Sequence, residues 1–192
     1  MVFIWTTPLN EYFREDLKRR DILEIVCSEL MDILMVFSFY RFARYSSTWR
    51  LPLAMVGFYG IRAILQSIWY VEKPDGYNWA YPGFISIFVP YGETSDFFYS
   101  GHVGVCVIMF LEFFSVGWYI LSVYSLFVAC AQGFMMIALR AHYTVDIISG
   151  ILFAHYFWIM AEKYCYLVDW YIYGIPLQKR MAYSGSLSDK DI

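Results

Sequence analysis

The longest uncharged stretch in the sequence runs from Phe113 to Leu139. One crossing of a bilayer takes about 20 apolar residues. Most of this stretch forms one such crossing, and Gly117 provides the turn from the crossing that precedes it. Across the whole chain, 60% of the residues are apolar and 16% are charged, whereas soluble domains average about 25% charged. A soluble particle of this size could not hide so much apolar surface. The sequence therefore predicts an all-α, polytopic membrane helix bundle.

Hydrophobic runs between turn signals predict about five transmembrane helices. They are expected at roughly 21–44, 51–70, 97–116, 118–139 and 142–163. The flanking parts are an interfacial N-terminal segment, 1–20, and a C-terminal tail, 166–192, around a transmembrane domain at 21–165. Residues 71–96 hold three of the six prolines, three glycines and several aromatics, which predicts a loop that covers one membrane face.

The first predicted span carries an unusual stripe of acids. Asp21, Glu24, Glu29 and Asp32 fall within roughly 140° of arc on a helical wheel. Charges facing lipid are costly, so this stripe must face other helices or water. One interpretation is an amphipathic helix that leans on a partner, and the other is a path for protons or ions.

Composition excludes several classes of function. A net charge of −3 argues against a nucleic-acid partner. The four cysteines are scattered without a CxxC pair, which indicates neither a disulfide framework nor a zinc site. Residues 1–20 lack the apolar core of a signal peptide and are too acidic for a mitochondrial presequence. Lys and Arg divide almost evenly between the two predicted sides, so they do not orient the chain.

Two polar islands interrupt the apolar second half: Ser100-Gly101-His102, and His142 followed by Asp146. His142 and Asp146 are four residues apart, so they share one face of a helix. About 40 residues separate the two histidines, enough for two crossings that return the chain to the same side. Helix parity then gathers seven polar residues near one face: Arg62, Asp96, Ser100, His102, Arg140, His142 and Asp146.

These residue types suit chemistry on a phosphate ester. A histidine held by a carboxylate keeps one ring nitrogen free to attack phosphorus, and a second histidine can protonate the leaving oxygen. Arginines and helix N-termini stabilise phosphate oxygens. The simpler alternative is that Asp146 only caps a helix or bonds to a neighbouring helix. A metal site of His102, His142 and Asp146 would lack a fourth ligand, so neither a metal nor a cofactor is expected.

Both islands are similar to motifs of a known family. Asp96 to His102 resembles the D-x3-S-G-H motif of the sphingomyelin synthase group, and His142 to Ile147 resembles its H-Y-[ST]-x-D-[VI] motif. This group belongs to the lipid phosphatase/phosphotransferase (PAP2-like) superfamily. The resemblance covers about residues 50–165 and is closest to the plant phosphatidylcholine:diacylglycerol cholinephosphotransferases.

The resemblance implies a role for each site residue. His142 would be the nucleophile that forms a phosphohistidine, Asp146 would orient it, and His102 would be the acid and base on the lipid hydroxyl. Substrate binding would involve Arg62, Asp96, Ser100, Gly101, Arg140 and Tyr143. The family moves phosphocholine between a phospholipid and diacylglycerol or ceramide, without metal or cofactor, on the lumenal side of the endoplasmic reticulum or Golgi.

The chain also departs from its relatives. Met136 stands where soluble-type members of the superfamily place an arginine, and their K-x6-R-P motif is missing, which disfavours a plain phosphatase. The family core appears without its first helix, so we expect residues 1–20 on the histidine side.

These departures leave a second hypothesis beside the transferase. It is an inactive structural or accessory subunit of a large membrane complex, for example in the mitochondrial inner membrane. Such a subunit would bind lipid in the retained pocket, and other membrane subunits would contact residues 1–44 and the C-terminal tail.

Overall fold

The computed structural model describes residues 2–46, 48–91, 97–171 and 174. This part of the chain is helical and holds no strand, so the prediction of an all-α membrane helix bundle is confirmed. The helices are α1 (Val2–Glu15), α2 (Leu17–Tyr45), α3 (Arg50–Ile68), α4 (Gly101–Ser115), α5 (Tyr119–Ala138) and α6 (Thr144–Tyr171).

Three of the described helices, α3, α5 and α6, are long and apolar enough to cross a membrane. α4 is equally apolar but has only 15 residues. α2 has 29 residues and carries the acidic stripe, so it is long enough but not apolar enough. These five helices correspond to the five predicted spans.

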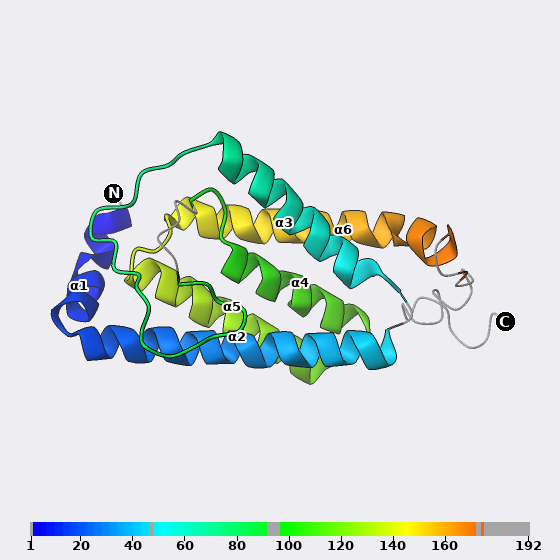
Figure 1. The fold of residues 1–192 in the computed structure, drawn as a ribbon, viewed down its shortest axis with the longest axis horizontal. Helices are drawn as coiled ribbons and strands as arrows, with labels where there is room; N and C mark the ends of the chain where they lie inside the picture. The colour runs from blue at the N-terminus through cyan, green and yellow to red at the C-terminus, as the bar shows by residue number, and fades with distance from the viewer. Residues whose placement is uncertain (1, 47, 92–96, 172–173, 175–192) are drawn as a thin grey trace.

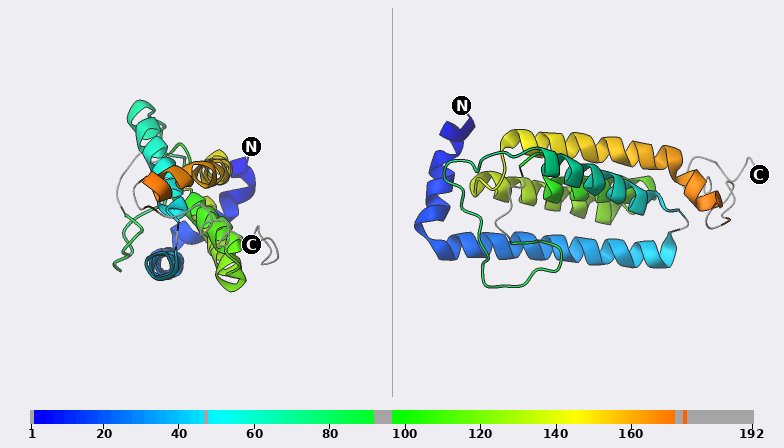
Figure 2. Two further views of the ribbon diagram at one scale, coloured as in Figure 1. Left: turned by 90° about the vertical axis from the view of Figure 1, so that its right-hand side faces the viewer. Right: turned by 45° about the horizontal axis from the view of Figure 1, so that its top comes forward.

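The helices α2 to α6 run lengthwise beside one another, and α1 lies across one end of the bundle (Figures 1 and 2). α4 is the central element, because it contacts α2, α3, α5 and α6. Its buried side chains, among them Val105, Ile108 and Met109, form the middle of the main hydrophobic core. The islands at the starts of α4 and α6 therefore lie at the same end of the bundle.

The N-terminal segment is a helix, α1, that closes the histidine end. The side-chain amide of Asn10 donates to the backbone oxygens of Ala138 (3.0 Å) and Gly76 (3.1 Å). These bonds join α1 to the end of α5 and to the loop before α4. Residues 1–20 were expected on the histidine side, and α1 lies there.

α6 continues to Tyr171, beyond the predicted end near Lys163. The stretch from Tyr164 to Tyr173 holds neither Gly nor Pro, so nothing in it stops a helix. The extension also has an anchor. Asp169 accepts hydrogen bonds from the Thr48 hydroxyl and the Trp49 backbone N–H, both 2.8 Å, just before α3 begins. The residues 175–192 of the predicted tail lie outside the described part of the chain.

A buried cluster of charges joins four helices at the end away from the histidines. Glu112 of α4 pairs with Arg41 of α2 (3.1 Å) and with Arg50 of α3 (2.7 Å). Arg50 also pairs with Glu162 of α6. Glu112 thus bridges two arginines at the opposite end of α4 from His102, and this geometry indicates a structural role.

The acidic stripe of α2 holds a segment of its own chain, residues 77–91, which we call the strap (Figure 1). Asp32 accepts bonds from the Ser86 hydroxyl (2.9 Å) and from the backbone N–H groups of Ile87 (2.7 Å) and Phe88 (3.0 Å). Glu24 accepts one from the N–H of Ala80 (3.2 Å). The partner on which this amphipathic helix leans is therefore the loop that precedes α4.

The charge cluster predicts a large loss of stability for Glu112→Gln. Breaking a buried ion pair leaves uncompensated charge and costs about 3–5 kcal/mol. The free energy of unfolding of Glu112→Gln, measured for purified protein in detergent, should be lower than that of the wild type by about 3–5 kcal/mol. Glu162→Gln is the control, because the Glu162 side chain is 37% exposed and pairs with Arg50 at the rim. Equal stability of the two variants would contradict this account.

The strap contacts predict faster amide exchange in Asp32→Ala. A hydrogen bond to a charged group contributes about 1.5–3 kcal/mol, so exchange at Ile87 and Phe88 should accelerate about tenfold or more. Hydrogen–deuterium exchange with mass spectrometry measures this directly. Glu29→Ala, at a half-buried acid one turn away, leaves the Asp32 bonds in place and should exchange as the wild type does. Unchanged exchange in Asp32→Ala would show that Asp32 does not hold the strap.

Candidate active site

The two histidine islands meet through a backbone hydrogen bond. The N–H of Ser100 donates to the backbone oxygen of Asp146 at 2.8 Å, so the start of α4 is attached to the first turn of α6. One turn further along α6, Gly150 lies against the same residue: a Cβ there would come within 2.7 Å of the Ser100 oxygen. Only glycine allows this approach. The predicted juxtaposition of the two islands is present in the structure.

Ser100 is also the N-cap of α4. Its hydroxyl accepts a bond from the N–H of Val103 (3.4 Å), as cap residues commonly do. The first N–H groups of a helix have no partners within the helix. Those of Gly101 and His102 therefore belong to a helix N-terminus, a position that favours anions.

His142 and Asp146 form a buried pair. The His142 Nδ1 lies 3.4 Å from Asp146 Oδ2, and both side chains are almost fully enclosed. The same carboxylate oxygen accepts a hydrogen bond from the backbone N–H of Tyr143 (3.0 Å), the residue just before α6. Asp146 thus caps the helix from its first turn and faces the imidazole as well. The Asp146 side chain can therefore cap the helix and orient His142 from the same position.

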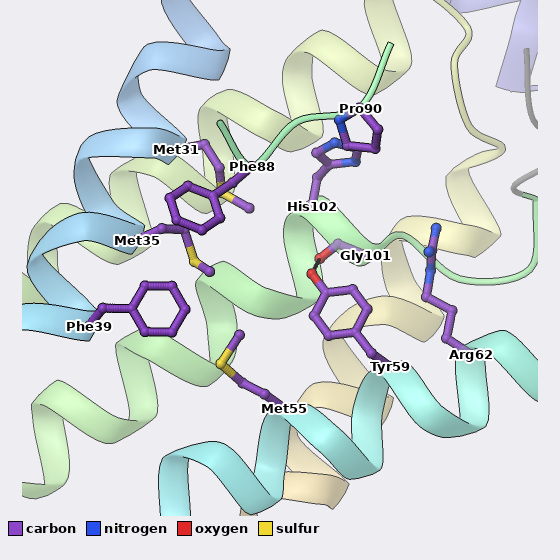
Figure 3. Close-up of a pocket in the computed structure, with 10 residues that line it drawn as sticks. All are labelled: Met31, Met35, Phe39, Met55, Tyr59, Arg62, Phe88, Pro90, Gly101 and His102. Carbon is purple, nitrogen blue, oxygen red and sulfur yellow. Dashed lines mark hydrogen bonds between the residues drawn. The ribbon is translucent and has the colours of Figure 1, made fainter. Parts of the chain in front are cut away.

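His102 lies at the start of α4, where its ring meets the ring of Trp79 edge-on, with centroids 6.0 Å apart. It lines a cavity of about 350 Å³ together with Gly101 and Arg62 (Figure 3). His142 and Arg62 both lie close enough to act electrostatically on His102. The two histidines and this arginine therefore share one neighbourhood.

Arg62 is placed by contacts with the start of α4. Its Nε donates to the backbone oxygen of Tyr99 at 3.1 Å. A Cβ at Gly101 would lie 3.1 Å from the guanidinium carbon, so the absence of a side chain there lets the cation approach the helix N-terminus. Nearby, the Tyr59 hydroxyl donates to the Gly101 oxygen (3.4 Å). Arg62 therefore lies beside His102 at the start of α4.

Arg140 has a different setting from the one predicted. Its guanidinium donates to the backbone oxygen of Asp75 (2.7 Å) and to the hydroxyl of Thr7 (2.8 Å), which joins α1 and the loop to the end of α5. Its backbone is left-handed, with φ of 51°, where the chain turns from α5 toward α6. These contacts belong to the closure of the histidine end, and a phosphate contact by Arg140 stays a prediction.

Tyr143 lies between α5 and α6, and its side chain points to the loop before α4. The hydroxyl donates to the backbone oxygen of Glu72 (3.1 Å). Burial, and then the nearby carboxylates of Asp146, Asp75 and Glu72, raise the pKa of the Tyr143 phenol above its ordinary value. The phenol therefore stays protonated and keeps this bond. Asp96, the remaining predicted residue, lies outside the described part of the chain.

Two aromatic residues complete the site and had no role in the sequence-based prediction. Phe97 is buried between the islands, with its ring centroid 6.0 Å from those of His142 and Tyr143. Trp79 of the strap lies against His102. Phe97 directly follows Asp96 in the first motif, which was the available signal. Trp79 is one of several aromatic residues in the loop 71–96, so its sequence context gave no signal of a place in the site.

The arrangement contains the groups that phosphoryl transfer requires. A buried imidazole faces a carboxylate, a second imidazole lies nearby, and an arginine borders a helix N-terminus. Among the described residues, no group of three or more His, Cys, Asp or Glu side chains could hold a metal ion. The expectation of a site that works without metal or cofactor remains a prediction.

Comparison with known proteins agrees with this geometry. Residues 94–164 match the family model described as PAP2 superfamily C-terminal, and this segment contains both histidine islands. The searches of curated proteins and of solved structures give no match. Residues 94–164 are therefore similar to the C-terminal part of the PAP2 superfamily, and this segment includes α4, α5 and most of α6.

Proposed function

We propose that this protein is an integral membrane lipid phosphotransferase that exchanges a phosphocholine-type headgroup between a phospholipid and diacylglycerol or ceramide. The observation that carries the proposal is the buried pair of His142 and Asp146, at the same end of the bundle as His102 and Arg62. The family match over both histidine islands supports the broader class, a PAP2-like membrane phosphatase or phosphotransferase. The organelle proposed from the resemblance is the endoplasmic reticulum or Golgi.

In the first half-reaction, His142 attacks the phosphorus of the donor lipid. Asp146 lies next to Nδ1, which leaves Nε2 as the attacking nitrogen. The bond between phosphorus and the diacylglycerol oxygen breaks, and His102 gives that oxygen a proton. The products are diacylglycerol and a phosphocholine group on His142. The Asp146 carboxylate stabilises the positive charge that develops on the imidazole.

In the second half-reaction, the acceptor hydroxyl gives its proton to His102 and attacks the same phosphorus. The bond to His142 breaks and the ring is restored. In this proposal, Arg62 and the N–H groups at the start of α4 stabilise the charge on the phosphate oxygens, and the close approach of Arg62 to Gly101 supports that role. Asp96, Ser100, Arg140 and Tyr143 keep their predicted roles in substrate binding as part of this proposal.

The proposal predicts that His142→Ala abolishes headgroup transfer, because the nucleophile is lost. Membranes that carry each variant would be given a phospholipid with a labelled headgroup, and label in the acceptor lipid would be measured. His155→Ala is the matched control, since His155 is an exposed histidine on the same helix. Equal transfer by wild type and His142→Ala would overturn the proposal and favour the alternative of an inactive complex subunit.

A second prediction separates the two roles of Asp146. In Asp146→Asn the amide oxygen can still accept from the N–H of Tyr143, so the helix cap should survive. The charge beside His142 is lost, and transfer should fall by about 10²-fold or more, the scale of general acid–base and orienting contributions. Thermal unfolding and transfer would both be measured. Loss of stability with unchanged activity per folded molecule would assign Asp146 to capping alone.

A further inference from the structure

The cavity beside His102 extends into a groove between α2 and α3 (Figure 3). One wall comes from α2, the other from α3, and the strap covers part of it. Its lining residues are Met31, Met35, Phe39, Met55, Tyr59, Arg62, Phe88, Pro90, Gly101 and His102. We refer to this cavity as the α2–α3 groove. Its volume of about 350 Å³ lies in the range of cavities that hold organic ligands.

The groove is polar at one end and apolar along the rest of its length. Arg62, Gly101 and His102 lie at the histidine end of the bundle. Because α2 runs away from that end and α3 runs toward it, Phe39 and Met55 line the opposite end (Figure 3). Three methionines form much of the apolar wall. Unbranched methionine side chains adapt to flexible apolar ligands.

The groove also opens toward the surroundings of the bundle. Phe39 and Tyr59 at its rim are 46% and 37% exposed. The neighbouring surface of α3 is strongly apolar, with Val56 70% exposed and Ile68 72% exposed on a helix long enough to span a membrane. A ligand could therefore enter from the apolar phase without crossing the polar end.

We propose that the α2–α3 groove binds an acyl chain of a glycerophospholipid, with the lipid phosphate next to Arg62 and His102. The groove and the lipid are both amphipathic. The groove has an apolar length that ends at a cation and a helix N-terminus, and the lipid has an acyl chain at one end and a phosphate at the other. The positive charge of Arg62 favours a phospholipid over an uncharged diacylglycerol. The position of the phosphate rests on the proposed function. Binding of the acyl chain in the groove does not depend on the transfer reaction.

The test uses a phosphatidylcholine that carries a photoreactive diazirine on one acyl chain, incorporated with the full-length protein into lipid vesicles. After illumination, mass spectrometry should find the label concentrated on the segments 31–39 and 55–59. A diacylglycerol with the same diazirine chain forms the second arm, and it should label these segments more weakly. Equal labelling by the two lipids would overturn the assignment of the phosphate end.

Two tryptophan substitutions provide a matched pair on one helix. Met55→Trp places a large ring inside the groove, whereas Val56→Trp adds the same ring on the outer surface of α3. Exclusion of about two methylene groups should reduce groove labelling about tenfold or more in Met55→Trp. Val56→Trp should label as the wild type does. Equal labelling of the two variants would overturn the proposal.

Two further variants keep the outcome interpretable. If Met55→Trp does not fold, Phe39→Trp can replace it, because it narrows the groove from an exposed rim position. Labelling of the groove should fall in this variant as well. Unchanged labelling would count against binding of the lipid in the groove. His142→Ala should retain groove labelling although transfer is abolished. Groove labelling that persists without any transfer activity in the wild type would reject the proposed reaction and keep the lipid site.

Discussion

The structure depends on one constraint: a polar group inside a membrane bundle needs a partner from the same chain, because lipid offers none. At the far end of α4, Glu112 satisfies this constraint with Arg41 and Arg50. On α2, Asp32 satisfies it with the strap. The charges at these two places are matched within the described residues. The histidine end differs in one respect, because His102 and Arg62 also line a cavity there.

The parts of the fold that follow periodicity could be predicted from the sequence. Apolar runs gave the helices, and the separation of about two crossings brought His102 and His142 to one end. Contacts between residues far apart in the chain could not be predicted. Nothing in the sequence connects Asp32 with Ile87, or Arg140 with Thr7, because such bonds depend on how loops return across helices. The length of α6 was underestimated for the same reason, since Asp169 has its partners before α3.

The candidate site shows a similar division. The two motifs predicted which side chains lie close together. The contacts that each side chain makes depend on distances of a few tenths of an ångström, which the sequence does not give. Asp146 illustrates this point, because one oxygen serves both the N–H of Tyr143 and the ring of His142. Arg140 illustrates the opposite case. Helix parity brought Arg140 to the histidine end, and the structure adds contacts of its guanidinium with α1 and the Asp75 loop that the sequence did not indicate. Adjacency in sequence does not fix the direction of a long side chain.

The backbone contact between Ser100 and the first turns of α6 has a further consequence for how such a protein can change. Because it involves main-chain atoms and Gly150, this contact between the starts of α4 and α6 does not depend on a side-chain rotamer. Substitutions in α2 or α3 can therefore reshape the space in front of the histidines while this main-chain contact stays in place. In a molecule built this way, the shape of the α2–α3 groove and the main-chain frame that joins the two histidine islands can vary independently of each other.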